Sequence, residues 1–121
     1  MKPSEIIDKA LVEVIPDESR WCQRALCDIH TGQHCAMGAL RVAAYGSILQ
    51  PVLIDHENGA YHEIAYHEMS NVSAAIQEIE RCIEACTGLD WPLFSFNDTH
   101  TYPEVREMME KARAGLQEEG Q

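Results

Sequence analysis

The stretch Trp91-Pro-Leu-Phe-Ser-Phe-Asn97-Asp98-Thr-His100-Thr101-Tyr-Pro-Glu104-Val105 decides how the last third of the chain folds. Its first half is an aromatic, strand-like run, and its second half carries the signature of a helix start. Thr101 is the expected N-cap, Pro103 lies in the first turn, and Glu104 completes a capping box. Polar groups at such a junction sit on a rigid scaffold, where proteins often keep binding or chemical groups, although turns and caps use the same residue types.

Apolar residues at three- and four-residue spacing predict three further helices besides the one that follows Thr101. They run from Pro3 or Ser4 to just before Pro16, from about Cys35 to Tyr45 with Gly46 closing, and from Ser70 or Asn71 to Thr87.

The segments between these helices carry turn signals. Asn58-Gly59 lies between half-alternating segments in residues 52–64 and predicts a hairpin, with a helix starting near Ala60 as the rival. Residues 17–34 are expected to form a connector with a short turn or strand. The prediction is therefore a single domain over residues 1–121, mainly α with minor β. About four short helices surround one core beside a small β-hairpin or short strands, and residues 118–121 fray.

Composition limits the classes of function. The chain has 20 carboxylates against 9 Lys and Arg, a formal net charge of −11. Such a surface disfavours direct DNA or RNA binding and favours docking onto a protein with a basic surface. No apolar run of about 18 residues and no export signal is found, so we expect no membrane contact and a cytoplasmic location, in the host cytosol if the chain is phage-encoded. No cofactor is expected.

Three short motifs follow one another along the chain: Trp21-Cys-Gln23, then Cys35-Ala-Met-Gly38-Ala-Leu40, then Phe96-Asn97-Asp98 leading into the last helix. In this order they resemble an uncharacterised family of small actinobacterial and phage proteins, a domain of unknown function. That family usually has Trp where this chain has Phe96, and residues 47–70 have no counterpart in it. The resemblance implies a phage or prophage setting in an actinobacterium, and no activity.

Five potential zinc ligands lie within residues 22–35, namely Cys22, Cys27, His30, His34 and Cys35. Structural zinc sites usually combine two close pairs from separate knuckles into a tetrahedral set. This cluster is contiguous and has no C-x-x-C pair, and the odd number of cysteines in the chain favours reduced, buried thiols. No metal site is therefore predicted, and a small zinc module on Cys22, Cys27, His30 and His34 is kept as an alternative.

Cys35 opens the predicted helix at residues 35–45, where a helix dipole lowers the pKa of a thiol. With His100 as base and Asp98 to orient it, this is the layout of a thiol hydrolase, with Gln23 or Gln33 as oxyanion donors. Small apolar neighbours indicate instead that the Cys35 thiol is buried and inert. A thiol-dependent hydrolase is therefore the alternative, and a non-enzymatic role is preferred.

Carboxylates line the last two predicted helices. Such faces are often merely solvated, but an array of carboxylates can also imitate a phosphate backbone toward a basic cleft. The leading hypothesis is a small acidic accessory protein of phage type that binds a host macromolecule, an inhibitor of a host defence or nucleic-acid enzyme being one form of this role. The residues predicted to bind are Glu78, Glu84, Glu104, Glu107, Glu110, Asn97 and Asp98.

Overall fold

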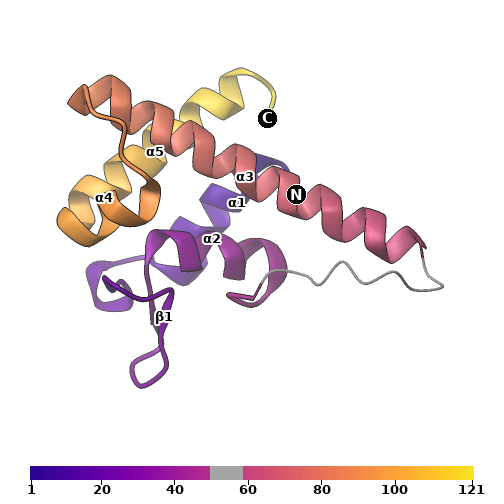
Figure 1. The fold of residues 1–121 in the computed structure, drawn as a ribbon, viewed down its shortest axis with the longest axis horizontal. Helices are drawn as coiled ribbons and strands as arrows, with labels where there is room; N and C mark the ends of the chain where they lie inside the picture. Colours follow the sequence, from indigo (N-terminus) through magenta and orange to yellow (C-terminus); the bar gives the residue numbers. More distant parts are fainter. Residues whose placement is uncertain (50–58) are drawn as a thin grey trace.

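The computed structural model of the chain describes the backbone of residues 1–49 and 59–121, and the side chains of 1–49 and 67–121. The described part is mainly α, with five α-helices and a small two-stranded antiparallel sheet, which confirms the predicted fold class (Figure 1). The elements are α1 (Pro3–Lys9), η1 (Ala10–Val14), η2 (Glu18–Arg20), β1 (Cys27–Asp28), β2 (Gln33–His34), α2 (Ala36–Tyr45), α3 (Gly59–Thr87), α4 (Leu93–Thr99) and α5 (Tyr102–Glu118). None of the helices described is long and apolar enough to cross a membrane.

The first predicted helix is present as α1 and η1 together, and it ends before Pro16 as expected. The second half, η1, is wound more widely as a π-helix. Ser4 near the start of α1 donates two hydrogen bonds to the Gln121 carbonyl, from its backbone N–H at 3.0 Å and from its hydroxyl at 2.7 Å. Residues 118–121, which we expected to fray, therefore end against α1.

One core lies between the helices, since α1 packs against α2, α3 and α5. Each helix contributes apolar side chains from one face, and burying each of them fully stabilises the fold by roughly 1.5–3 kcal/mol. The largest fully buried apolar side chains are Ile6, Ile7, Leu11, Ile15, Leu40, Ile79, Ile83, Leu93, Val105 and Met109.

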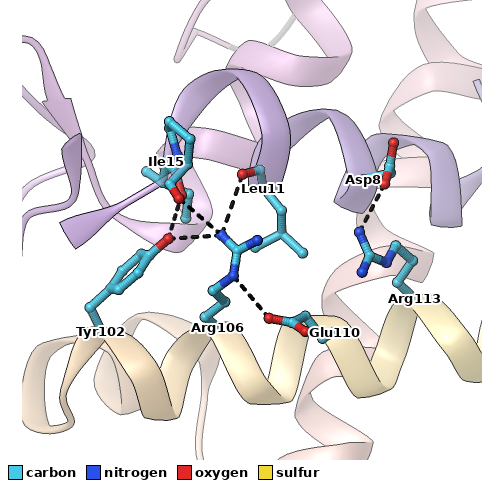
Figure 2. A network of polar contacts seen from close by, with 8 residues as sticks. Asp8, Leu11, Ile15, Tyr102, Arg106, Glu110 and Arg113 are labelled. Carbon is cyan, nitrogen blue, oxygen red and sulfur yellow. Dashed lines mark hydrogen bonds and ion pairs between the residues drawn. The ribbon is translucent and has the colours of Figure 1, made fainter. Parts of the chain in front are cut away.

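The capping box predicted for α5 is confirmed: Thr101 Oγ1 accepts from the Glu104 N–H, and Glu104 accepts from the Thr101 N–H at 2.9 Å. This start places the first two turns of α5 against the end of η1 (Figure 2). There the Tyr102 hydroxyl donates to the Ile15 carbonyl at 2.7 Å, and Arg106 donates to the Tyr102 hydroxyl at 2.9 Å.

The hairpin predicted in residues 52–64 is wrong in its second strand, because α3 begins at Gly59. Residues 50–58 lie outside the described residues, and the rival, a helix starting near Ala60, is correct. Ser70 and Asn71 consequently lie inside α3 and do not cap it. The cause is the apolar stripe further along α3, because a helix anchored there extends by gaining one hydrogen bond for each added residue.

The aromatic run at residues 91–96 is the second correction, since residues 93–99 form helix α4 and no strand. Pro92 precedes the helix and provides no side-chain cap. Instead, the carboxylate of Glu80 on α3 accepts from the Leu93 N–H at 2.7 Å. Leu93 and Phe96 are buried on one face, whereas Phe94 is 56% exposed.

The helix predicted from about Cys35 to Tyr45 is confirmed as α2, with Cys35 as its N-cap. Gly46 ends it at φ 78°, a left-handed conformation that glycine adopts without strain. Gly88 follows α3 in the same conformation at φ 75°, and the helix ends at Thr87 as predicted. The sequence spacing of Cys82 and Cys86 predicts that both lie on the core face of this helix. Cys82 is buried as predicted, whereas Cys86 is exposed.

Candidate functional site

The side chain of Asn97 joins the three sequence motifs. It is fully buried on α4, and its Oδ1 accepts from Trp21 Nε1 at 2.7 Å and from the Ala36 N–H at 3.0 Å. Its Nδ2 donates to the Cys22 carbonyl at 3.1 Å. A buried amide with unpaired groups would be costly, whereas here donor and acceptor are both used. Segments more than sixty positions apart in the chain therefore meet at one residue.

The loop from Trp21 to Leu26 is held against α4 by further bonds, and we call it the Trp21–Leu26 loop. The amide of Gln23 donates to the carbonyls of Asn97 at 3.1 Å and His100 at 3.0 Å. The Arg24 N–H donates to Asp98 Oδ1 at 2.7 Å. Arg24 has φ 69°, the one left-handed residue other than glycine in the part of the chain described. That conformation costs roughly 1–3 kcal/mol and persists only where the surroundings fix it.

Gly38 explains the Cys-x-x-Gly spacing of the second motif. A Cβ at this position would lie 2.0 Å from the Leu26 carbonyl oxygen, so only glycine allows α2 to approach the loop so closely. The Gly38 N–H also donates to Cys35 Sγ at 3.4 Å, and the Cys35 N–H donates to the Leu26 carbonyl at 3.4 Å.

A pocket of about 240 Å³ opens between this loop, α2 and α4. We call this pocket the Cys35 pocket, after its buried lining residue Cys35, whose exposed fraction is 4%. The lining residues are Arg24, Ala25, Leu26, Cys35, Phe94 and Asp98. A shallower hollow of about 540 Å³ lies between the chain ends and the side of α3, and Met1, Pro3 and Asn71 are among the residues that line it.

The thiol hydrolase layout is only partly assembled. Asp98 borders the Cys35 pocket, but His100 is not among the residues that line it. The His100 ring stacks on Phe96 at 3.8 Å between centroids, and its Nδ1 lies 3.0 Å from the Phe96 carbonyl oxygen. Burial raises the pKa of the Cys35 thiol despite its bond from Gly38, and the charge of Asp98 raises that pKa further. The thiol therefore stays protonated and weakly nucleophilic at neutral pH.

The amides of Gln23 and Gln33, the oxyanion donors of that alternative, are already used. Gln23 binds two backbone carbonyls, and Gln33 Nε2 donates to the Ser19 carbonyl at 3.0 Å.

The potential zinc ligands do not converge on one point in the described residues. Cys27 lies opposite His34 in the β1–β2 pair, His30 is exposed, and Cys22 Sγ donates to the Ala25 carbonyl at 3.5 Å. Burial raises the pKa of Cys22 to about 11 and lowers the pKa of His34, whose buried Nδ1 has no hydrogen-bond partner. Within residues 1–49 and 67–121, no three His, Cys, Asp or Glu side chains form a group that could hold a metal ion.

Most of the carboxylates predicted to bind a partner are engaged within the chain. Glu78 pairs with Arg81, Glu104 caps α5, Glu107 lies 3.4 Å from Lys111, and Glu110 lies 2.9 Å from Arg106. Glu84 is exposed and, among the contacts described, makes no ion pair. Of the predicted set, Asn97 belongs to the interior and Asp98 to the pocket. The sequence gives no sign of the roles of Arg24 and Phe94.

Comparison with known proteins adds a family and no activity. The profile of one family, described as a family of unknown function, matches residues 1–115. Neither the curated proteins nor the solved structures contain a match.

Proposed function

Because the chain belongs to the family of unknown function DUF6197 over residues 1–115, its function has to be argued from its own residues, and we propose that it is a binding protein whose partner carries a basic surface. The proposed partner is a host macromolecule. One version of this role is inhibition of a host defence enzyme or of a nucleic-acid enzyme. The phage-type setting of this proposal rests on the resemblance of the three motifs alone.

The observation that carries the proposal is the charge balance. If each of the 9 Lys and Arg neutralised one of the 20 carboxylates, eleven carboxylates would remain. Among the contacts of residues 1–49 and 67–121, at least five of these cations already lie in ion pairs: Lys9, Arg81, Arg106, Lys111 and Arg113. The surplus negative charge is therefore available to a basic partner, which it attracts over a Debye length of about 8–10 Å at ordinary salt.

The exposed carboxylates best placed for this role make no hydrogen bond or ion pair among the described contacts. They are Glu18, Glu84, Asp90, Glu118 and Glu119. We propose that these residues, and not the paired Glu78, Glu107 and Glu110, make the contact. The raised pKa of the buried Cys35 thiol supports binding over thiol catalysis.

The test is capture of a partner from an actinobacterial lysate at two ionic strengths. The matched proteins are the wild type, a neutralised variant with Glu84→Gln, Asp90→Asn, Glu118→Gln and Glu119→Gln, and a control with Glu78→Gln and Arg81→Gln, whose net charge is unchanged. A basic partner should be captured at about 0.01 M salt and released at about 1 M, where the Debye length falls to about 3 Å.

Each exposed contact contributes roughly 0.2–1 kcal/mol, so neutralising four of them should weaken binding of that partner about fourfold or more. The control should bind it as the wild type does. A partner that is retained equally at both salt concentrations and by the neutralised variant would refute the electrostatic role.

A further inference from the structure

Two residues on the rim of the Cys35 pocket, Arg24 and Asp98, carry opposite charges. Asp98 uses Oδ1 to accept from the Arg24 N–H at 2.7 Å and from Asn97 Nδ2 at 3.3 Å, and its Oδ2 makes no hydrogen bond in the described structure. The guanidinium of Arg24 makes neither a hydrogen bond nor an ion pair with any described residue. Arg24 differs in this from Arg81, Arg106 and Arg113, which all lie in ion pairs.

The backbone at Arg24 is strained and firmly held. Its φ of 69° disfavours every residue type except glycine and, to a lesser degree, Asn and Asp. The hydrogen bonds that join the Trp21–Leu26 loop to Asn97, Asp98 and His100 fix this conformation before any ligand arrives. Such over-determined strain is concentrated at ligand sites, where it positions a side chain in advance.

The remaining walls of the pocket are apolar and the space is small. Ala25, Leu26 and the half-exposed ring of Phe94 line it, and the buried Cys35 thiol adds a neutral surface. Its volume of about 240 Å³ lies below the roughly 300–1,000 Å³ of sites for drug-sized ligands. A ligand with one charge would leave the opposite rim charge without a partner, whereas a compact zwitterion satisfies both.

We propose that the Cys35 pocket binds a free α-amino acid with a small apolar side chain. The ligand carboxylate meets the Arg24 guanidinium, the ammonium meets the Asp98 carboxylate, and the side chain lies against Leu26 and Phe94. The site is separate from the carboxylates proposed to contact a basic partner, so either proposal can fail without the other.

The test uses the purified full chain and L-leucine, followed by calorimetry and by backbone amide NMR shifts. L-leucine methyl ester keeps the ammonium and removes the carboxylate charge, and N-acetyl-L-leucine does the reverse. We expect saturable binding of L-leucine, with shifts at Arg24, Phe94 and Asp98. Loss of one charge-assisted contact should weaken the binding of each analogue by about ten- to a hundredfold.

Two variants separate ligand contact from folding. Asp98→Asn keeps an oxygen to accept from the Arg24 N–H and removes the charge, and Arg24→Asn tolerates the left-handed backbone and removes the guanidinium. Both should remain folded and bind L-leucine about ten- to a hundredfold more weakly. Arg20→Asn, at an exposed position that does not line the pocket, should bind as the wild type does.

Three results would overturn the assignment: no saturable binding of L-leucine, equal binding of either analogue, or wild-type affinity in both folded pocket variants. Tighter binding of N-acetyl-L-leucine than of L-leucine would also reject the free amino acid, because it would point to the C-terminus of a peptide.

Discussion

Replacing Asn97 with Ala should destabilise the protein more than almost any other single change at a polar residue. The substitution leaves three groups without their partner: the Trp21 indole N–H, the Ala36 N–H and the Cys22 carbonyl. Each buried group left unsatisfied costs about 1–3 kcal/mol, and water entering the space recovers part of that. We therefore expect the free energy of unfolding to fall by about 3–6 kcal/mol, a large share of the roughly 5–15 kcal/mol that holds a typical domain together.

The assay is urea unfolding followed by far-UV circular dichroism and by tryptophan fluorescence. For a slope of about 1.5 kcal/mol per molar urea, the midpoint should fall by about 2–4 M or the variant should be unfolded without denaturant. Asn71→Ala is the matched control, because the half-buried Asn71 side chain donates one hydrogen bond among the described contacts, a solvent-exposed bond to the Met1 carbonyl at 2.7 Å. We expect that control to cost under about 0.5 kcal/mol. If Asn97→Ala costs no more than Asn71→Ala, Asn97 does not hold the three motifs together.

Gly38→Ala should lower the thermal midpoint by several degrees or prevent folding, because its Cβ would lie 2.0 Å from a backbone oxygen of the facing loop. In Gly115→Ala the added Cβ would meet only side-chain atoms, of Glu78 at 3.1 Å and of Arg81 at 3.9 Å, so this control should be neutral or stabilise by up to about 1 kcal/mol. Under native conditions iodoacetamide should modify the exposed Cys86 well before Cys35, because burial raises the pKa of the Cys35 thiol. Peptide mass spectrometry that finds Cys35 modified first would contradict a weakly nucleophilic thiol. Burial lowers the pKa of His34, so the unfolded chain binds the proton more readily, and stability should fall as pH drops below about 6.5. In His34→Gln the free energy of unfolding, measured by urea denaturation, should fall less between pH 7 and pH 5 than in the wild type. An equal fall in both proteins would count against this cause.

Much of the fold could be predicted where the determinants are local in sequence. The capping box of Thr101 and Glu104 involves residues three positions apart, so its residue types alone indicate where α5 begins. Pro16 and Gly46 likewise act on their own backbone, and the predicted ends of the first two helices were correct to within a few residues.

The errors arose where a distant residue decides the local structure. Asn58-Gly59 favours a turn, but Val72, Ala75 and Ile79 further along α3 are buried in the core, and the helix that they anchor begins at Gly59. Tertiary packing of this kind overrides a short-range turn preference.

The candidate site was predictable only in part. Each motif was visible in the sequence, and Asn97, Asp98 and Cys35 were chosen from it. The meeting of these motifs depends on bonds across more than sixty positions, and nothing in an Arg-Ala pair indicates a left-handed backbone at Arg24. His100 was assigned to the thiol by residue type, whereas its ring packs on the aromatic side chain of Phe96.

The cross-helix bond from Leu93 to Glu80 has a practical consequence for anyone who would graft this motif onto another scaffold. Since Pro92 provides no cap, the acidic residue of α3 sets where α4 starts, and with it the rotation at which Asn97 and Asp98 are presented. A transplanted Leu93–Thr99 segment would lose that reference point. The recipient protein would have to supply a carboxylate at the same height beside the new helix.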